Sequence, residues 1–433
     1  MKEGKKIGLS LSGGGYRASI YHLGTLKKLR EMNILDKVDV ISTISGGSIT
    51  GAFFGLHNEN FEEFENGMIK IVKQDIINKV LVSKRFLIIA FCLLTLLSSI
   101  LYLLFTEYAW FSTPILIFSI YLLTMYQYKI FPVSRIISSL YSKLFFENKL
   151  LGDLCKFPVI AINATNIETG RQFTFSRNKM SDSAYEFPLD KSATVKFKHQ
   201  EFPIGLAVAS STCVPFAFTP IYIEKVYYQN ESDYKRIRPC LVDGGVYDNQ
   251  GVHKLTQKNS SYECDVIIVS DAGSIMPRFS TFNNVLQLLI RTSDIFMNRI
   301  KNYQMIQHVY ENYRFNMKQI AYQSLGWDFE SCISGFVDNL KKGAILETVI
   351  KAHNITEEEI LNNDWDQIQK KIEAQLNYEI IKNKQPNIDE LKIARSVTTN
   401  LKKLSDCQIN ALIKQAECLT EIQIKLYCPH LIN

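Results

Sequence analysis

The chain has 433 residues, 46% of them hydrophobic, and its 49 basic and 43 acidic residues leave a net charge of +6. This length can bury a large core and could hold two or three domains. So nearly balanced a charge argues against a nucleic-acid partner, whereas a mild basic excess suits a protein beside anionic lipid headgroups.

The 9 cysteines are scattered without a CxxC pair, which predicts reduced thiols in a cytosolic compartment and no structural metal. The start of the chain leads directly into a strand, so no signal peptide is expected.

The first sixty residues alternate between strand and helix. The hydrophobic pattern predicts a strand over residues 6–11, a helix from Ala18 to about Met32, a strand from Val38 to Ile44 and a helix from Gly46 to about Leu56. Such βαβ alternation predicts a parallel sheet with helices on both faces.

Two apolar segments then interrupt this pattern. Residues 86–106 and 108–128 are each 21 residues long and carry no charge. Each is long enough to cross a hydrocarbon core of about 30 Å. They predict a transmembrane helical hairpin with spans at about 86–106 and 109–128. A buried core hairpin and an interfacial or re-entrant hairpin are the alternatives.

The charges that flank the hairpin predict its orientation. Lys84, Arg85 and Lys129 lie at the outer ends, whereas the short connection between the two helices holds only Glu107. By the positive-inside rule, both outer ends and the remainder of the chain are expected on the cytoplasmic side.

Strands and helices resume after the hairpin. A helix is predicted over residues 134–154 and another over 204–211, and strands are predicted over 157–163, 171–175, 193–197, 218–223, 238–242 and 264–270. Beyond Asp271 the chain is predicted to be mostly helical, for example over 283–315, with a late loop near 387–390.

Ser45 is the candidate nucleophile. It lies where an apolar strand meets a helix, and Gly46 and Gly47 allow a tight turn and close approach of a substrate. The G-x-S-x-G pattern is imperfect, because Thr43 stands in place of the first glycine. Ser48 is the competing serine, but it is expected inside the helix. A Ser-Gly-Gly-Ser string alone is commonly a plain turn or helix cap.

A glycine run after the first strand provides a candidate oxyanion hole. Gly13, Gly14 and Gly15 could direct backbone N–H groups at an anion without side chains in the way. Arg17 could help to hold a phosphate or carboxylate group, and Gly46 could support substrate binding. A nucleotide-binding loop is the alternative, but neither G-x-G-x-x-G nor a P-loop motif is present.

Asp243, in an Asp-Gly-Gly turn after a late strand, is the candidate base. A carboxylate bonded to the serine hydroxyl can take its proton where burial raises the carboxylate's pKa. The plain interpretation of this motif is a turn. Among the histidines, His22 is expected to be a packing or hydrogen-bonded residue, and His253 is a weak alternative base.

Together these segments resemble the patatin-like phospholipases. The resemblance covers residues 6–56 and about 148–275. Its blocks are Ser12–Arg17 with Tyr21–Leu26, Thr43–Ser48, Asn163–Gly170, Ala209–Phe216 and Asp243–Asn249. It implies a patatin-like, Rossmann-type three-layer α/β/α fold, a Ser45–Asp243 dyad, no metal or other cofactor, and hydrolysis of lipid acyl esters.

We therefore expect three regions. Residues 1–62 and 148–275 form the catalytic domain, residues 63–147 form an inserted region with the transmembrane hairpin, and residues 276–433 form a mostly helical region. The predicted function is a membrane-anchored serine lipid acyl hydrolase of the phospholipase or lysophospholipase type, a multi-pass protein with a cytoplasmic catalytic domain. Membrane lipids are its expected substrate and anchor, and a homo-oligomer or a protein partner could bind the helical region. The alternative is a membrane scaffold or triggered effector whose hydrolase site is silent or vestigial.

Overall fold

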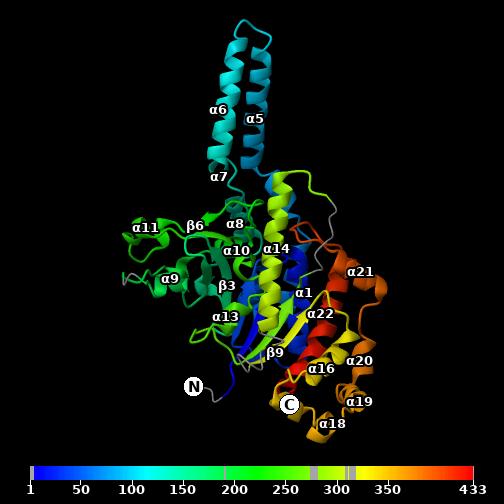
Figure 1. Ribbon diagram of the computed structural model, residues 1–433. Helices are drawn as coiled ribbons and strands as arrows, with labels where there is room; N and C mark the ends of the chain where they lie inside the picture. Colours follow the sequence, from blue (N-terminus) through cyan, green and yellow to red (C-terminus); the bar gives the residue numbers. More distant parts are fainter. Residues whose placement is uncertain (1–3, 190–191, 274–280, 308–310, 312–317, 433) are drawn as a thin grey trace.

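The computed structural model describes residues 4–189, 192–273, 281–307, 311 and 318–432 (Figure 1). Its centre is an α/β domain from which a helical hairpin projects, and the helices of residues 331–382 lie at the opposite end of the molecule. The expectation of an α/β fold with a largely helical C-terminal region is confirmed.

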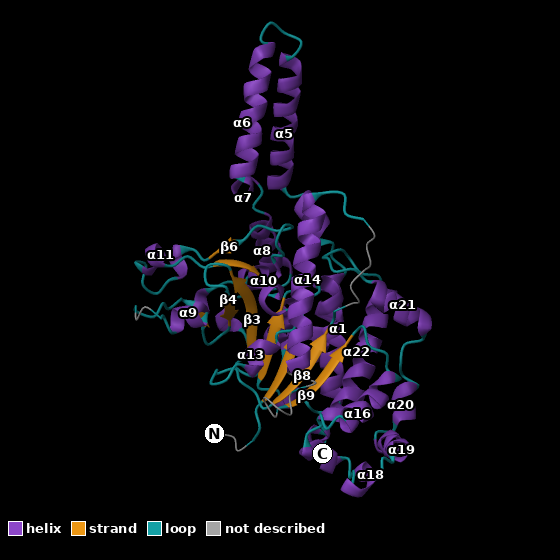
Figure 2. Ribbon diagram, in the orientation of Figure 1, coloured by secondary structure: helices purple, strands orange, loops and turns teal. Residues whose placement is uncertain are grey.

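The described residues form one mixed sheet of 9 strands, in which the main order is β5-β4-β3-β2-β1-β8-β9 (Figure 2). Five strands run parallel: β1 (Ile7–Leu11), β2 (Val40–Ile44), β3 (Val159–Asn166), β8 (Val266–Asp271) and β9 (Gln319–Ser324). Four are antiparallel to their neighbours: β4 (Arg171–Phe175), β5 (Met180–Ser181), β6 (Ile221–Tyr222) and β7 (Cys240–Asp243). The parallel pairing expected from the first sixty residues is present between β1 and β2, but the later strands make the whole sheet mixed. The link from β3 to β4 is a tight turn with Gly170 at φ 65°, and so short a link can join only antiparallel strands.

Side chains alternate between the two faces of the sheet. In β8, Val266 and Ile268 belong to the large core under the helices α1 (Gly15–Glu31), α2 (Gly46–His57) and α22 (Asp406–Tyr427). Ile267 and Val269 belong to the opposite core, which includes residues of α13 (Val252–Thr256) and the last turn of α14 (Val285–Met305).

The C-terminal region is part of the same packing unit as the sheet. A Cβ added at Gly24 of α1 would lie 2.6 Å from the carbonyl oxygen of Ile413 in α22, so the two helices cross in backbone contact. Strand β9 also extends the sheet beside β8. The boundary predicted near residue 275 does not coincide with a break in the packing.

The inserted region forms the projecting hairpin. It begins with α3 (Phe61–Val72) and α4 (Ile76–Leu81), continues through α5 (Lys84–Leu103), a 3-10 turn (Ala109–Phe111) and α6 (Ser112–Met125), and ends with α7 (Gln127–Ile130) and α8 (Val133–Leu144). Among the described helices, only α5 is by itself long and apolar enough to cross a membrane. The second predicted span is a helical run from Ala109 to Met125 that meets the run Gln127–Leu144 at a bend of 77°.

Several predicted elements differ from the structure. The strand predicted over 193–197 is wrong, because only Phe197 forms an isolated bridge, with Tyr228, and its apolar residues are buried by an aromatic cluster instead. The strand predicted over 218–223 is shortened to β6, since Pro220 before it cannot donate a ladder hydrogen bond. The helix predicted over 134–154 ends at Leu144, shortly before two residues with positive φ (Glu147 and Asn148).

Two further differences lie beyond the sheet. The loop predicted near 387–390 is the start of α21 (Ile388–Ser396), where the Asn387 and Glu390 side chains cap each other's backbone N–H groups. The helix predicted over 283–315 ends as α14 at Met305, and most of residues 308–317 lie outside the described residues.

The remaining helices are short. They are α9 (Ser183–Glu186), α10 (Ile204–Thr212), α11 (Asp233–Arg236), α12 (Gly245–Asp248), α16 (Ser331–Lys341), α17 (Glu347–Ala352), α18 (Glu357–Leu361), α19 (Trp365–Gln375) and α20 (Tyr378–Lys382). Further 3-10 turns cover Leu35–Lys37, Leu151–Asp153, His199–Glu201, Lys225–Tyr227 and Pro429–Leu431.

Candidate active site

The sheet register brings Ser45 and Asp243 together. β2 runs parallel to β3, and its last pair is Ile44 with Asn163. β7 runs antiparallel to β3, and its last pair is Asp243 with Ala164. The carboxyl ends of β2 and β7 therefore meet head to head beside adjacent residues of β3. Ser45 follows β2 directly, and Asp243 is the last residue of β7.

Ser45 lies on a sharp turn between β2 and α2. Its φ of 48° and ψ of −119° are a strained conformation for a residue with a side chain. Its Oγ donates a hydrogen bond of 2.8 Å to Oδ2 of Asp243. The next residues must be small, because a Cβ at Gly46 would lie 2.1 Å from the carbonyl oxygen of Gly15, and one at Gly47 would lie 2.5 Å from that of Leu11.

A network of hydroxyl groups stabilises the turn at Ser45. The backbone N–H of Ser45 donates to Oγ of Ser211 at 2.9 Å, and Ser211 in turn donates to the carbonyl oxygen of Asn163 at 2.6 Å. Oγ of Ser48 lies 2.9 Å from Oγ of Ser211 and 3.0 Å from Oγ1 of Thr43. Ser48 is therefore inside α2, as expected, and away from Asp243.

Thr43 replaces a glycine without blocking the turn. A Cβ at Gly51, two turns into α2, would lie 2.4 Å from the Thr43 methyl group, so this glycine makes room for the threonine. The threonine hydroxyl contributes to the supporting network instead.

The carboxylate of Asp243 is held in place and is electrostatically unusual. Oδ1 accepts a hydrogen bond of 2.7 Å from the N–H of Gly245, and Oδ2 accepts the one from Ser45. Burial raises the pKa of Asp243 to about 6, and these two hydrogen bonds lower it only in part. A carboxylate with this pKa is ionised at neutral pH, yet it is basic enough to take a proton from a reacting hydroxyl group.

The glycine run wraps around the end of β1. Gly14 and Gly15 have φ values of 144° and 58°, a region that favours glycine. The N–H of Gly13 donates to the carbonyl oxygen of Asn249 at 2.9 Å and is therefore already used. Among the described residues, no protein group accepts a hydrogen bond from the N–H of Gly14, Gly15 or Gly46. These three N–H groups remain candidate donors to an oxyanion.

Arg17 is held by backbone carbonyl oxygens, and its predicted role in holding a phosphate or carboxylate group stays a prediction. Its Nε donates to the carbonyl oxygen of Ala272 at 3.0 Å, and one terminal nitrogen donates to that of Val397 at 3.1 Å. The side chain is buried, and burial lowers its pKa to about 10. Arg17 thus ties the glycine run to the end of β8 and to the C-terminal region.

Neither of the two histidines considered above contacts Ser45 among the contacts that the structure describes. His22 is fully buried, its ring nitrogens lie 2.8 Å from Oγ of Ser270 and 2.9 Å from the carbonyl oxygen of Ser12, and burial lowers its pKa to about 4. His253 packs on Tyr247 in α12, with Nε2 3.4 Å from the tyrosine hydroxyl. His22 is a packing residue, as expected, and the alternative base His253 interacts with α12 and not with the dyad.

The dyad is enclosed. Ser45 is 7% exposed and Asp243 is 3% exposed. Helix α14 lies next to α12, and a Cβ added at Gly245 would lie 3.2 Å from the terminal methyl group of Met297. Neither the Ser45 nor the Asp243 side chain is therefore widely open to solvent in this structure.

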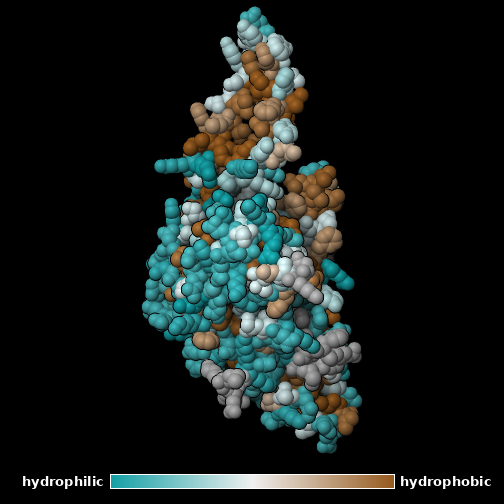
Figure 3. Space-filling view, turned by 90° about the vertical axis from the view of Figure 1, so that its left-hand side faces the viewer, coloured by the Kyte–Doolittle hydropathy of each residue, from teal (hydrophilic) through white to brown (hydrophobic). Residues whose placement is uncertain are grey.

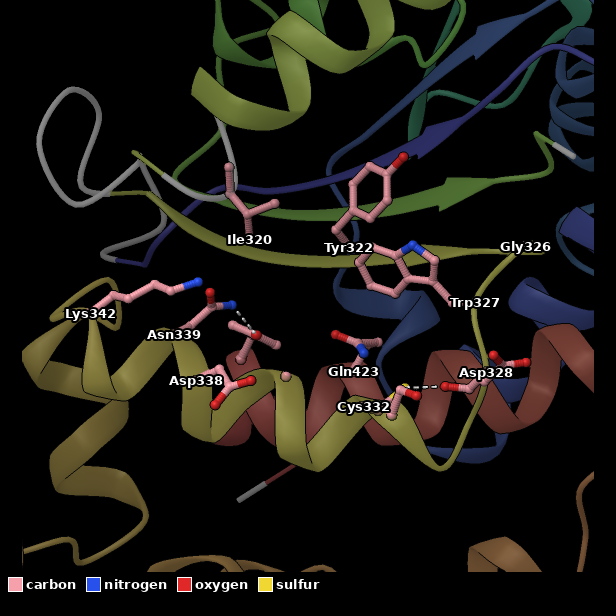
Figure 4. Close-up of a pocket in the computed structure, with 13 residues that line it drawn as sticks. Ile320, Tyr322, Gly326, Trp327, Asp328, Cys332, Asp338, Asn339, Lys342 and Gln423 are labelled. Atoms are coloured by element: carbon pink, nitrogen blue, oxygen red, sulfur yellow. Dashed lines mark hydrogen bonds between the residues drawn. The ribbon is translucent and has the colours of Figure 1, made fainter. Parts of the chain in front are cut away.

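The cavity in Figure 4 is a separate feature. Its volume is about 420 Å³, and it lies between β9, α16 and α22, with Tyr322, Trp327 and Gln423 in its wall. None of its lining residues belongs to the dyad or to the glycine run.

The lower part of α14 is anchored by a buried ion pair. Nζ of Lys301 lies 2.6 Å from Oδ2 of Asp271, which also accepts hydrogen bonds from Tyr322 and Ser324. Asp271 is fully buried. Although burial alone would raise its pKa, the Lys301 ammonium group and the hydrogen bonds lower it to about 2.

Asp271→Asn is expected to lower the free energy of unfolding by about 3 kcal/mol, because it leaves the Lys301 ammonium group unpaired. Thermal unfolding at neutral pH measures the change. Adding Lys301→Met should recover part of the loss, since no unpaired charge then remains. A double variant as unstable as Asp271→Asn would contradict the ion-pair explanation. Because the pKa of Asp271 is lowered, its contribution is present above about pH 4 and is lost as the pH falls through about 2.

Sequence reasoning missed three groups at the site. Oγ of Ser211 accepts a hydrogen bond from the N–H of Ser45, and the carbonyl oxygen of Asn249 accepts one from the N–H of Gly13. The carbonyl oxygen of Asn400 accepts a hydrogen bond of 3.0 Å from the N–H of Tyr16. Ser211 and Asn249 lie within the blocks of the family resemblance, which was the only signal for them. Nothing in the sequence marks Asn400.

The sequence from residue 9 to 256 matches the family model of the patatin-like phospholipases. Because this match covers more than half of the chain, the protein belongs to the patatin-like phospholipase family. Membership of this family implies hydrolysis of lipid esters. No curated protein sequence matches the chain significantly.

Solved structures show only distant likeness. The crystal structure of VipD from Legionella pneumophila matches 98% of this chain and 86% of its own, with 13% identity and a TM-score of 0.32. Human GIVD cytosolic phospholipase A2 matches 62% of this chain and 43% of its own, with 15% identity and a TM-score of 0.35. At these values the likeness carries no inference about activity.

Proposed function

We propose that the protein is a membrane-anchored serine hydrolase of lipid acyl esters, of the phospholipase or lysophospholipase type. Ser45 is the nucleophile, and Asp243 is its base. The observation that carries the proposal is the 2.8 Å hydrogen bond from Oγ of Ser45 to the buried carboxylate of Asp243. The strained turn at Ser45 supports it, since such turns hold a nucleophile at the end of a strand.

The reaction uses groups of this chain at every step. Oγ of Ser45 attacks the ester carbonyl carbon while Asp243 takes the hydroxyl proton. The tetrahedral intermediate collapses, the acyl–Ser45 ester remains, and the leaving alcohol receives the proton from Asp243. Water then attacks the acyl-enzyme with Asp243 as base, which releases a fatty acid and restores Ser45.

The oxyanion of each tetrahedral intermediate needs donors that are already in position. The N–H groups of Gly14 and Gly15 supply them, and the N–H of Gly46 adds a donor at the positive end of α2. Gly13 shapes the loop through its bond to Asn249.

The hairpin of α5 and α6 is the proposed anchor. Its apolar side chains are exposed along its length; Leu87, Phe91 and Leu94 of α5 are more than half exposed, and so are Ile117 and Phe118 of α6. So large an apolar surface is costly in water and stable in lipid. In this proposal both helices cross the bilayer, and the basic residues at their outer ends keep the catalytic domain on the cytoplasmic side.

A second candidate function is a triggered effector, silent until its site opens. The observation that favours it is the burial of both dyad side chains. In that case the same chemistry would follow only after an activator had been bound.

Ser45→Ala is expected to abolish labelling by a fluorophosphonate probe and to reduce the release of fatty acid from phospholipid vesicles by about 10³-fold or more. Ser48→Ala is the matched control, since Ser48 lies three residues after Ser45, at the start of α2, but contacts Thr43 and Ser211. It should keep labelling and most of the hydrolysis. Unchanged hydrolysis in Ser45→Ala would contradict the proposal, whereas labelling only after a cell extract is added would favour the triggered effector.

A further inference from the structure

The first turns of α14 are exposed in the part of the chain that the structure describes. Every residue from 281 to 290 is exposed. Five of the first six residues of the helix are apolar, and they are 41% to 72% exposed: Val285, Leu286, Leu288, Leu289 and Ile290. We call these five side chains the α14 tip. A helix end with apolar side chains exposed on all its sides is expected to meet another apolar phase.

The position of the α14 tip identifies that phase. Lys301 fixes the lower part of α14 to Asp271 at the carboxyl end of β8. Val285 lies sixteen residues before Lys301, which is about 24 Å along the helix. This length brings the tip level with the foot of the hairpin (Figure 1). Figure 3 shows a second hydrophobic patch at this level, separate from the hairpin and above a largely hydrophilic body.

A second apolar segment lies at the same end of the molecule. Val214 is 39% exposed and Phe216 is 57% exposed, in the loop after α10. Ser134, directly after the hairpin, exchanges two hydrogen bonds with Thr219 and so holds this loop beside the foot of the hairpin. The hairpin, this loop and the α14 tip thus present apolar groups at one level.

The same helix lies close to the turn that holds Asp243. Met297 lies halfway along α14 and approaches Gly245, the residue that holds the Asp243 carboxylate. A tilt of the helix that lifted Met297 away would open a path to Ser45.

We propose that the α14 tip docks on the lipid surface crossed by the hairpin, and that this docking moves α14 away from Ser45 and Asp243. The inference rests on the proposed function, because the position of the bilayer relative to the protein follows from the proposed spanning hairpin. The occupant is lipid and not a second protein, since a bilayer crossed by the hairpin fills the space beside the tip. The site is then open for most of the time at the membrane, whereas in water it opens only transiently and supports a low activity on soluble esters.

The first test measures insertion without catalysis. In the full-length Ser45→Ala protein, with the exposed Cys92 and Cys407 replaced by serine, Val285→Cys carries an environment-sensitive fluorophore. In phosphatidylcholine vesicles the label should shift to the blue, and lipids with a nitroxide near the headgroup should quench it. Leu361→Cys is the matched control, because Leu361 is 78% exposed at the opposite end of the molecule. Its label should remain in water.

The outcomes of this test are distinct. A Val285 label that stays in water overturns the inference, even if the wild-type protein hydrolyses lipid. A label that shifts in detergent with increasing protein concentration and without vesicles also overturns it, since the tip would then bind a second copy. Insertion in a chain whose wild type hydrolyses nothing would support the docking and refute only the proposed function.

The second test measures the opening of the site. The variant Leu286→Ser/Leu289→Ser, in otherwise wild-type protein, should lose about tenfold in vesicle hydrolysis and keep its activity on a water-soluble short-chain ester. Leu361→Ser should change neither. An equal loss on both substrates would indicate damage to folding or to the site and would overturn the inference, as would full vesicle hydrolysis by the double variant.

Discussion

Asp243→Asn is expected to abolish lipid hydrolysis and at the same time to make the protein more stable. The amide cannot take the Ser45 proton, so activity should fall by about 10³-fold or more. Its carbonyl oxygen can still accept the N–H of Gly245, so the turn is kept. The substitution removes a buried charge whose raised pKa reports an unfavourable environment.

The pH dependence of stability follows from the direction of this shift. The pKa of Asp243 is about 6 in the folded chain, against 3.8 for an ordinary aspartate. The folded state therefore holds the proton more tightly, and wild-type stability falls as the pH rises from about 4 to about 6. The full difference corresponds to about 3 kcal/mol above this window. Wild type and Asp243→Asn should unfold alike at about pH 4 and diverge at about pH 8, with a gain of about 1 to 3 kcal/mol for the variant.

Thermal unfolding in detergent at the two pH values measures this gain, and hydrolysis of a short-chain ester measures the loss of activity. Wild-type hydrolysis should rise with pH through about 6 and then level off, because only the ionised carboxylate acts as a base. Asp271→Asn provides a contrast of opposite sign, since it removes a stabilising charge. An Asp243→Asn protein that is less stable than wild type at neutral pH would show that this carboxylate holds the fold together.

The central part of the fold could be predicted because its signals are local. The strand that ends at Ile44, the glycines after Ser45 and the Asp243 turn each follow from short patterns of hydrophobicity and turn residues. Their order along the chain matched a family, and this implied that they would meet. The register that makes them meet, head to head along β3, depends on pairing across many residues and has no local pattern.

The other parts of the site depend on contacts between distant segments. Asn400 and Val397 reach the glycine run only because α22 packs on α1 at Gly24. β9 was missed because the strand is rich in polar residues and lacks an apolar run. Polar groups of other elements satisfy these residues inside the core: Gln323 donates to Thr25 of α1 and to Thr420 of α22. The exposure of the α14 tip is likewise invisible in a sequence, where an apolar helix end resembles any core helix.

Deletion of the hairpin is the other change with a large expected effect. Residues 84–131, replaced by a short glycine-serine linker, leave α4 and α8, which contact each other in the structure. The variant should leave the membrane fraction of cells. Its hydrolysis of vesicles should fall by about 10²-fold or more, since tethering no longer concentrates the site at its substrate. Its activity on a water-soluble ester should stay within a few-fold of wild type, because the hairpin supplies no group to the dyad.

The control separates tethering from a specific role of the hairpin. An unrelated pair of spanning helices, inserted at the same place, should restore hydrolysis of vesicles. A tether that restores membrane binding without restoring hydrolysis would mean that α5 or α6 itself guides lipid to Ser45. A deletion variant that remains in the membrane fraction would contradict the anchor. In this proposal the α14 tip cannot replace the hairpin, because five apolar side chains on two turns bind a lipid surface weakly and reversibly, whereas helices that span the bilayer would hold the chain there. The two proposed contacts would therefore have different roles: the hairpin would keep the protein at the membrane, and α14 would respond to the presence of lipid beside the site.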